Sequence, residues 1–132
     1  MNLVSIRIIT ADLARLVAFY ELVTGVPADW ATPEFAEVRT PAGTVALGST
    51  RTVPLFAPGS AEPAANRTAI VEFLVDDVDA EYRRLAPALA DVVTEPTTLP
   101  WGNRSLLFRD PDGNLVNLFT PVTEQAVARF SR

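Results

Sequence analysis

The stretch Arg104–Thr120, RSLLFRDPDGNLVNLFT, decides the fold of this chain. Residues 110–113, Asp-Pro-Asp-Gly, form a tight-turn sequence: proline presets φ, the first aspartate can bond its own backbone, and glycine tolerates a positive φ. The flanking segments Ser105–Arg109 and Leu115–Thr120 are short and rich in strand-forming residues. The stretch therefore predicts a β-hairpin.

The outgoing strand of this hairpin carries Leu115, Asn117 and Phe119 on one face, because side chains alternate along a strand. Both of its faces are mostly apolar, so we expect the sheet to be covered on both sides. Asn117 is then a polar group in a mostly apolar wall, where it must find a hydrogen-bond partner. The identity of that partner is the functional question.

The composition limits the chemistry that the chain can perform. With 132 residues, of which 48% are hydrophobic and 20% charged, it suits one folded globular domain. The sequence has no cysteine and no histidine, which excludes disulfides, thiolate metal sites and the commonest general base. Any metal ion would need oxygen ligands.

The formal net charge of −5 argues against nucleic acid as a partner, because no basic stripe is present to neutralise phosphates. The charge mildly favours cationic small molecules, although acidic surfaces often serve solubility alone. No apolar run reaches the roughly 18 residues of a membrane span, and the N-terminus has no signal-peptide core. We therefore expect a cytoplasmic protein.

The first half of the chain predicts a strand, a helix and three short strands. The first strand covers Leu3–Ile9, and the helix begins after Thr10 or Asp12 and ends at Gly25. The apolar stripe of this helix is Leu13, Leu16, Val17, Tyr20 and Val23. The three strands are expected at residues 28–31, 35–40 and 44–49.

The second half begins after a connector at about residues 51–66, which contains three prolines. One of three aspartates, Asp76, Asp77 or Asp79, caps the second helix, and Pro87 ends or kinks it. The expected elements are a strand at 67–75, a helix with Val78, Tyr82, Leu85 and Leu89 at helical spacing, a short strand around 92–93, the hairpin, and a short helix in the tail.

The two halves repeat one pattern. Residues 11–13 (ADL) match residues 76–78 (DDV), 65 positions later, and residues 40–43 (TPAG) match 110–113 (DPDG), 70 positions later. One sheet and one helix cannot bury both faces alone, so we expect an α+β fold in which two βαβββ modules form cupped mixed sheets around a cleft. The predicted boundaries are module 1 at about 1–50, the connector at about 51–66, module 2 at about 67–121 and a tail at 122–132.

The first strand of each module has one apolar face, which a helix should cover, and one mixed face, which we expect to line a partly wet cleft. The mixed faces carry Ser5 and Arg7 in module 1, and Ile70 and Glu72 in module 2. Arg7 and Glu72 stand at matching places, 65 positions apart. They form either a structural ion pair between the modules or a pair that orients the polar groups of a ligand.

Three strings in the sequence carry a family resemblance: FY…G at residues 19–25, VDDVDA at 75–80, and WG…FRDPDGN at 101–114. With them the chain resembles the vicinal oxygen chelate superfamily, which includes glyoxalases, bleomycin-resistance proteins and extradiol dioxygenases. The resemblance covers both modules. It implies the glyoxalase/bleomycin-resistance fold, a cleft in each cupped sheet and usually a homodimer.

Metal-using members of that superfamily hold their ion with side chains on the first and last strands of each module. Aligned on the two turns, those positions are Ser5, Leu47, Ile70 and Asn117. A hydroxyl, two apolar groups and an amide are poor ligands for a divalent cation. The resemblance therefore points to the metal-free, antibiotic-binding-like branch, and we expect no metal, no cofactor and no catalytic residue.

We expect the protein to bind and sequester a small molecule, for example an antibiotic or another natural product, without a metal ion. The alternative is a glyoxalase- or dioxygenase-like enzyme that acts on a small oxygenated metabolite through an atypical metal site or through Glu72. A third interpretation is a module that only associates with another protein.

Aromatic side chains are the candidates for stacking on a planar ligand. Trp30 and Trp101 lie near the predicted cleft mouths, Phe119 shares a face with Asn117, and Phe56 on the connector would act as a lid. The structural alternative for the tryptophans is a core aromatic that seats a loop. The predicted ligand-binding set is Ser5, Arg7, Trp30, Leu47, Phe56, Ile70, Glu72, Trp101, Asn117 and Phe119.

Overall fold

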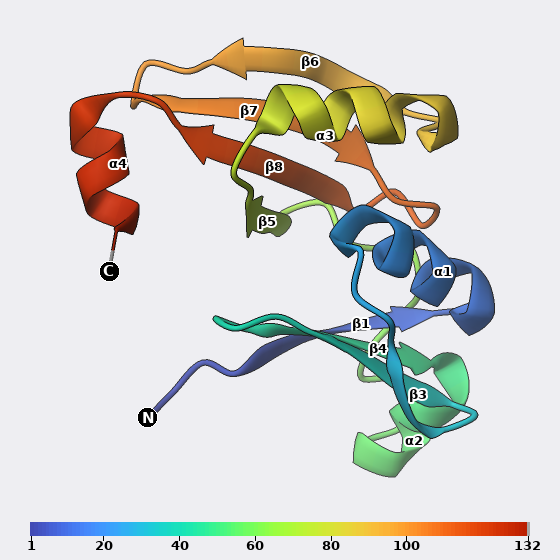
Figure 1. Ribbon diagram of the computed structural model, residues 1–132. Helices are drawn as coiled ribbons and strands as arrows, with labels where there is room; N and C mark the ends of the chain where they lie inside the picture. Colours follow the sequence, from blue (N-terminus) through green and yellow to red (C-terminus); the bar gives the residue numbers. More distant parts are fainter. Residues whose placement is uncertain (132) are drawn as a thin grey trace. The chain divides into compact units, whose positions relative to one another are not determined.

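Figure 1 shows the computed structural model, which describes residues 1–131 of the chain. The chain divides into two units, Met1–Asn66 and a second unit that begins at Arg67. Each unit contains one four-stranded mixed sheet in βαβββ order, so the predicted α+β class and repeat are confirmed. Within the described residues, every helix is too short or too polar to span a bilayer.

Unit 1 contains sheet 1 and the longest helix of the described residues. Its strands and this helix are β1 (Ser5–Thr10), α1 (Leu13–Thr24), β2 (Asp29–Thr32), β3 (Phe35–Arg39) and β4 (Thr44–Ser49). The strand order is β1-β4-β3-β2, with β1 parallel to β4 and the other neighbours antiparallel. The parallel pair brings the first strand of the module beside its last strand.

Helix α1 packs against β3 and β4 on one face of sheet 1 (Figure 1). Its start is capped by Asp12, whose carboxylate accepts a hydrogen bond from the backbone N–H of Arg15 at 3.2 Å. Gly25, with a φ of 69°, ends it in the left-handed conformation. Its buried side chains are the five that the sequence predicted, namely Leu13, Leu16, Val17, Tyr20 and Val23.

The predicted connector begins with helical structure that the sequence analysis missed. A turn of 3₁₀ helix at Thr50–Thr52 leads into the short helix α2 (Val53–Phe56). The hydroxyl of Thr52 donates a hydrogen bond to the carbonyl of Ser49 at 2.7 Å, which holds the first turn against the end of β4. Pro54 stands in the first turn of α2, where a proline is compatible with a helix, so its presence did not mark a loop.

Unit 2 repeats the pattern and adds a C-terminal helix. Its elements are β5 (Ile70–Leu74), α3 (Val78–Leu85), β6 (Val92–Thr98), β7 (Asn103–Arg109), β8 (Leu115–Pro121) and α4 (Glu124–Phe130). The strand order is β5-β8-β7-β6. β6 is longer than the predicted strand around residues 92–93, because an edge strand with register shifts tolerates Pro96. The predicted tail helix is confirmed as α4; Arg132 lies outside the described residues.

The hairpin between β7 and β8 is organised by the carboxylate of Asp110. Its Oδ1 accepts hydrogen bonds from the backbone N–H groups of Asp112 at 2.8 Å and Asn114 at 3.0 Å, and its Oδ2 accepts one from Asn114 Nδ2 at 2.7 Å. Gly113 has a φ of 84°. Because Asp110 is only 5% exposed, these bonds replace the hydration of a buried group. The predicted hairpin and its turn are confirmed.

An ion pair joins α3 to β7. Arg104 donates from Nε to Asp79 Oδ2 at 2.9 Å and from Nη2 to Asp79 Oδ1 at 3.0 Å, which is bidentate geometry. The hydrogen bond from Arg104 holds the pKa of Asp79 below its ordinary value. This pair therefore stabilises the packing of α3 on its sheet in a pH-dependent way.

We expect Asp110→Ala to lower the free energy of unfolding by about 2–4 kcal/mol, because two backbone N–H groups and one amide lose a charged acceptor. Urea unfolding followed by circular dichroism measures the change. The control is Asp29→Ala, which removes a carboxylate that is 62% exposed and should change stability by less than about 1 kcal/mol. An Asp110→Ala protein as stable as the control would contradict the role of this carboxylate.

The ion pair gives a second prediction. The pKa of Asp79 is lower in the folded than in the unfolded state, so the pair stabilises the fold above the unfolded pKa of about 3.9 and loses its effect as the pH falls through the folded pKa. The stability difference between the wild type and Asp79→Asn should therefore shrink between pH 6 and pH 3 in urea unfolding. When Arg104 is replaced by glutamine, the stability difference that Asp79→Asn causes should be small at both pH 6 and pH 3. Equal differences at pH 6 and pH 3 in the wild-type background would refute this account.

Candidate functional site

The strand register shows which side chains share a face of sheet 1, because paired residues on neighbouring strands point to the same side. Arg7 pairs with Ala46, and Ala46 pairs with Glu37. The opposite face, with Leu47 and Val38 fully buried, is the one under α1. We call the face that carries Arg7 open face 1. Its residues on β1, β3 and β4 are Ser5, Arg7, Ile9, Phe35, Glu37, Arg39, Thr44, Ala46 and Gly48.

Two residues of the predicted ligand-binding set lie on the other side of sheet 1. Leu47 pairs with Ile8 and Ala36 and is fully buried, so it lies on the side of sheet 1 opposite to Ser5, and the turn alignment that grouped the two residues at one site is displaced by one position. Trp30 also pairs with Ala36, which places it on the same side as Leu47, on the edge strand β2. Neither side chain belongs to open face 1.

The two turns differ in length, and this difference explains the error. In unit 1 the N–H of Thr40 donates to the carbonyl of Gly43 at 3.0 Å, which closes a loop of two residues. In unit 2 the N–H of Asp110 donates to the carbonyl of Asn114 at 2.9 Å, which closes a loop of three. The turn of unit 2 is therefore one residue longer than the turn of unit 1. The alignment of residues 40–43 with 110–113 did not account for this additional residue, Asn114.

The additional residue changes the offset between the two halves. Equivalent residues of the two units are 70 positions apart before the turn and 71 positions apart after it, because β4 begins at Thr44 and β8 at Leu115. A shift of one residue moves a side chain to the opposite face of a sheet. The residue of unit 1 that matches Asn117 is therefore Ala46, which the sequence analysis missed.

The guanidinium group of Arg7 lies against two aromatic rings on open face 1. Its carbon is 4.2 Å from the centroid of the Phe35 ring and 5.2 Å from that of the Phe56 ring. Phe35 pairs with Gly48 in the sheet, whereas Phe56 comes from α2. The structure thus brings two residues of the predicted set, Arg7 and Phe56, together with the ring of Phe35.

The other charged side chains beside Arg7 on this sheet pair with one another. Arg39 Nη2 lies 3.0 Å from Glu37 Oε1 and 3.4 Å from Asp29 Oδ2. The hydrogen bond to Glu37 raises the pKa of Arg39 above its ordinary value. These three residues form a local charge network on β2 and β3.

Open face 2 is the corresponding face of sheet 2. Glu72 pairs with Asn117, and Asn117 pairs with Leu107, so these three share a side. The opposite side, with Val116 and Leu118 buried, packs under α3. The residues of open face 2 on β5, β7 and β8 are Ile70, Glu72, Leu74, Asn103, Ser105, Leu107, Arg109, Leu115, Asn117, Phe119 and Pro121.

The amide of Asn117 has one partner, and its orientation follows from that partner. Nδ2 donates to Glu72 Oε2 at 2.8 Å, and only the nitrogen can donate to a carboxylate. Oδ1 of Asn117 is consequently turned away from Glu72, and it is buried without a hydrogen-bond partner among residues 1–131. The hydroxyl of Ser105, on the same face, is also buried without a partner in that part of the chain. A buried unpaired polar group costs about 1–3 kcal/mol, so open face 2 can gain from bonds to a ligand.

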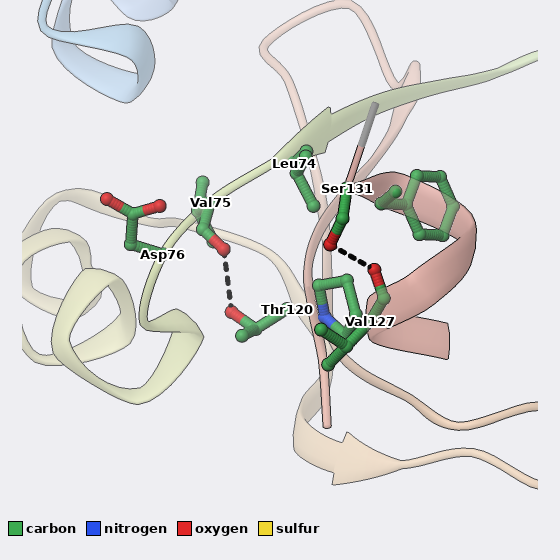
Figure 2. A pocket seen from close by; sticks show the side chains of 8 residues that line it. Leu74, Val75, Asp76, Thr120, Val127 and Ser131 are labelled. Carbon is green, nitrogen blue, oxygen red and sulfur yellow. Dashed lines mark hydrogen bonds between the residues drawn. The ribbon is translucent and has the colours of Figure 1, made fainter. Parts of the chain in front are cut away.

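A shallow groove of about 220 Å³ lies beside open face 2, where α4 packs against β8 (Figure 2). Phe119 contacts Phe130 of α4, with ring centroids 5.2 Å apart. The hydroxyl of Thr120 donates to the carbonyl of Val75 at 2.9 Å and holds one wall in place. The groove is lined by Leu74, Val75, Asp76, Thr120, Pro121, Val127, Phe130 and Ser131. Sequence analysis missed it, because no local signal showed where the tail helix would pack.

Gly102 allows the start of α4 to dock on the turn between β6 and β7. Its φ is 93°, and its carbonyl accepts hydrogen bonds from the N–H groups of Val122 at 2.9 Å and Thr123 at 3.3 Å. A Cβ atom at this position would collide with the side chain of Thr123. Trp101, from the predicted set, is 65% exposed, so it is not a core aromatic.

The residues at the four positions implied by the family resemblance do not fit a metal ion. Ser5 and Ile70 stand at the starts of β1 and β5, and the other two positions are Ala46 and Asn117. A methyl and an aliphatic group provide no ligand atom, so only the hydroxyl of Ser5 and the amide oxygen of Asn117 remain, and two neutral oxygens are too few to replace the hydration shell of a divalent cation. Within residues 1–131, no group of three or more His, Cys, Asp and Glu side chains could hold a metal ion.

The contacts that the structure gives Arg7 and Glu72 lie within their own units. Arg7 contacts Phe35 and Phe56, and Glu72 accepts the hydrogen bond from Asn117. An ion pair between Arg7 and Glu72 stays a prediction, as does a common cleft of the two modules.

Comparison with known proteins gives consistent matches along nearly the whole chain. Residues 2–118 match the family model of the Glyoxalase/Bleomycin resistance protein/Dioxygenase superfamily. The uncharacterized protein YraH of Bacillus subtilis (strain 168) is 29% identical over 125 residues, which cover 90% of this chain and 98% of that protein.

Solved structures show the same fold. A glyoxalase/bleomycin resistance protein/dioxygenase from Nocardioides superposes with a TM-score of 0.76 at 24% identity, over 94% of this chain and 85% of that one. A glyoxalase/bleomycin resistance protein/dioxygenase family enzyme from Burkholderia phytofirmans PsJN superposes with a TM-score of 0.77 at 20% identity, over 89% of this chain and 97% of that one.

The docking of α4 can be tested at Gly102. Gly102→Ala should displace α4 from the turn and lower the free energy of unfolding by roughly 1–3 kcal/mol, because the new methyl group meets Thr123 and φ is positive. Gly43→Ala is the matched control, since a Cβ there has open space and no positive φ is required. Urea unfolding compares the two variants. Equal stabilities would show that α4 does not depend on this contact.

Proposed function

We propose a function from one premise: the chain belongs to the Glyoxalase/Bleomycin resistance protein/Dioxygenase superfamily. The protein binds a small, partly aromatic molecule without the help of a metal ion, and it acts by sequestering that molecule. An antibiotic or another natural product is the class of ligand that this function implies.

Open face 2 carries the proposal. The buried Oδ1 of Asn117 and the buried hydroxyl of Ser105 have no hydrogen-bond partner within residues 1–131, and a ligand whose binding turns these groups toward its donors would satisfy both. Ile70 and Leu74, on the same face, are 48% and 52% exposed, so an apolar part of the ligand can be buried against them. A few oriented polar groups among apolar side chains are typical of a small-molecule site.

The positions of the family's metal ligands support binding without a metal ion. Ser5, Ala46, Ile70 and Asn117 do not make a ligand set for a divalent cation. Carboxylate, imidazole and thiolate groups, which hold metals in proteins, are absent from all four positions.

A second candidate function is enzymatic, and Glu72 is the observation that favours it. Glu72 is an exposed residue on open face 2, and its carboxylate accepts a hydrogen bond from Asn117 at 2.8 Å, so this group is placed to exchange a proton with a bound metabolite. This alternative has two forms, one that uses a metal ion and one that uses Glu72 alone. Measuring the metal content of the purified protein tests the first form. A stoichiometric divalent ion would favour the enzyme and contradict metal-independent binding.

The binding function predicts that a ligand raises the melting temperature of the purified protein in a panel of antibiotics and planar natural products. Asn117→Leu should weaken that ligand by roughly tenfold or more, because the amide that completes its hydrogen bonds is lost. Gln125→Leu is the control, since it removes an exposed amide from α4. Isothermal titration calorimetry measures the affinities.

The results decide between the three interpretations. Binding that Asn117→Leu weakens and Gln125→Leu does not would support the proposal. Turnover of a bound compound would favour the enzyme, which a substitution of Glu72 by glutamine should then inactivate. Absence of any thermal shift across the panel would overturn the binding function and favour a module that only associates with another protein.

A further inference from the structure

We infer that open face 1 contains an anion site, in which Arg7 binds the carboxylate of a small organic acid with an apolar or aromatic body. The inference goes beyond the proposed binding function, because it assigns a ligand of a stated chemical class to a second site. All of its residues belong to unit 1, whereas Asn117 and Ser105 belong to unit 2.

The guanidinium group of Arg7 has no polar partner in the described part of the chain. None of the ion pairs within residues 1–131 includes it, and no described atom accepts a hydrogen bond from its side chain. The sequence has 16 acidic residues, and the nearby carboxylate of Glu37 pairs with Arg39 instead. The N–H donors of Arg7 are therefore available to a bound anion.

Aromatic contacts hold this group in place without using its hydrogen-bond donors. The rings of Phe35 and Phe56 attract the cation through their faces. The N–H groups of a guanidinium lie in its plane, in a fork that matches the two oxygens of a carboxylate. Contact with the rings already restricts the conformations of the Arg7 side chain, so less conformational entropy is lost when a ligand binds. The guanidinium group is therefore preorganised for a planar anion.

The floor around Arg7 is made of small residues. Ala46 is its neighbour on β4, and Gly48 follows two residues later on the same face. A Cβ atom at Gly48 would lie 3.9 Å from Nη1 of Arg7 and 2.9 Å from the hydroxyl oxygen of Thr52. A larger side chain at Gly48 would therefore crowd the guanidinium and the turn that leads into α2.

Exposed apolar side chains of α2 belong to the same site as the Arg7 guanidinium. Phe56 is 69% exposed and Leu55 is 83% exposed, although α2 is only one turn long. A ligand that places its carboxylate on Arg7 can bury its apolar body against these side chains. A purely inorganic anion would leave them in water, so the combination favours an organic acid.

The test uses 2-naphthoate and its neutral counterpart 2-naphthamide with the intact protein. We expect 2-naphthoate to bind in isothermal titration calorimetry at least about tenfold more tightly than 2-naphthamide, and to shift the Arg7 Nε–H resonance in ¹H–¹⁵N spectra. Because the net charge of −5 repels anions at long range, such binding requires a local cation.

Three variants identify the cation. Arg7→Met should weaken 2-naphthoate binding by about tenfold or more, and Arg7→Lys should bind with intermediate affinity because it keeps the charge but loses the fork. Arg51→Met is the matched control: its side chain is 82% exposed and belongs to the same unit, and it should bind as the wild type does. Circular dichroism confirms that each variant is folded.

Equal affinity of the wild type and Arg7→Met for 2-naphthoate would overturn the inference. So would 2-naphthamide binding as tightly as 2-naphthoate, or a wild-type protein that does not bind 2-naphthoate. None of these results removes the proposed function, because that function is judged by the natural-product panel and by Asn117→Leu in the other unit.

Discussion

The register of two parallel strand pairs is the constraint on which the candidate site depends. β1 lies beside β4 and β5 beside β8, and these pairings decide which side chains face α1 or α3 and which face away. Because side chains alternate along a strand, a change of one residue in either pairing would exchange the core for the open face. In unit 2 the neighbouring antiparallel register, between β7 and β8, follows from a loop of three residues that the Asp110 carboxylate closes.

Local signals in the sequence were sufficient for most of the fold. The stripe from Leu13 to Val23 and the cap at Asp12 are contained in one segment of chain, so α1 could be predicted residue by residue. The hairpin around Asp110 was predictable for the same reason. The repeat of the two halves then followed from the positions of these signals along the chain.

The errors occur where the outcome depends on residues far apart or on a small difference in length. Leu47 was assigned to the wrong face because the sequence does not show that Asn114 lengthens one turn and not the other. The groove under α4 depends on Gly102, which lies more than twenty residues before the helix that it receives. Helix α2 was missed because the prolines around it suggested a loop.

The same fold presents two different chemistries on its open faces. In unit 1, Arg7 and the rings beside it offer a cation and apolar surface. In unit 2, the matching position is Glu72, which engages the amide nitrogen of Asn117, and the amide oxygen of Asn117 is left buried without a partner among the described residues. A repeated backbone thus positions side chains equivalently, while the side chains themselves decide what each face can bind.

The central claim is that Ala46, and not Leu47, shares open face 1 with Arg7. Nuclear Overhauser contacts between assigned side chains of the isotope-labelled protein test it most directly. The register predicts contacts from the Ala46 methyl group to the Arg7 side chain, and from the Leu47 methyl groups to Ile8. Contacts from Leu47 to the Arg7 side chain, with Ala46 turned toward Ile8, would contradict the register and the site built on it.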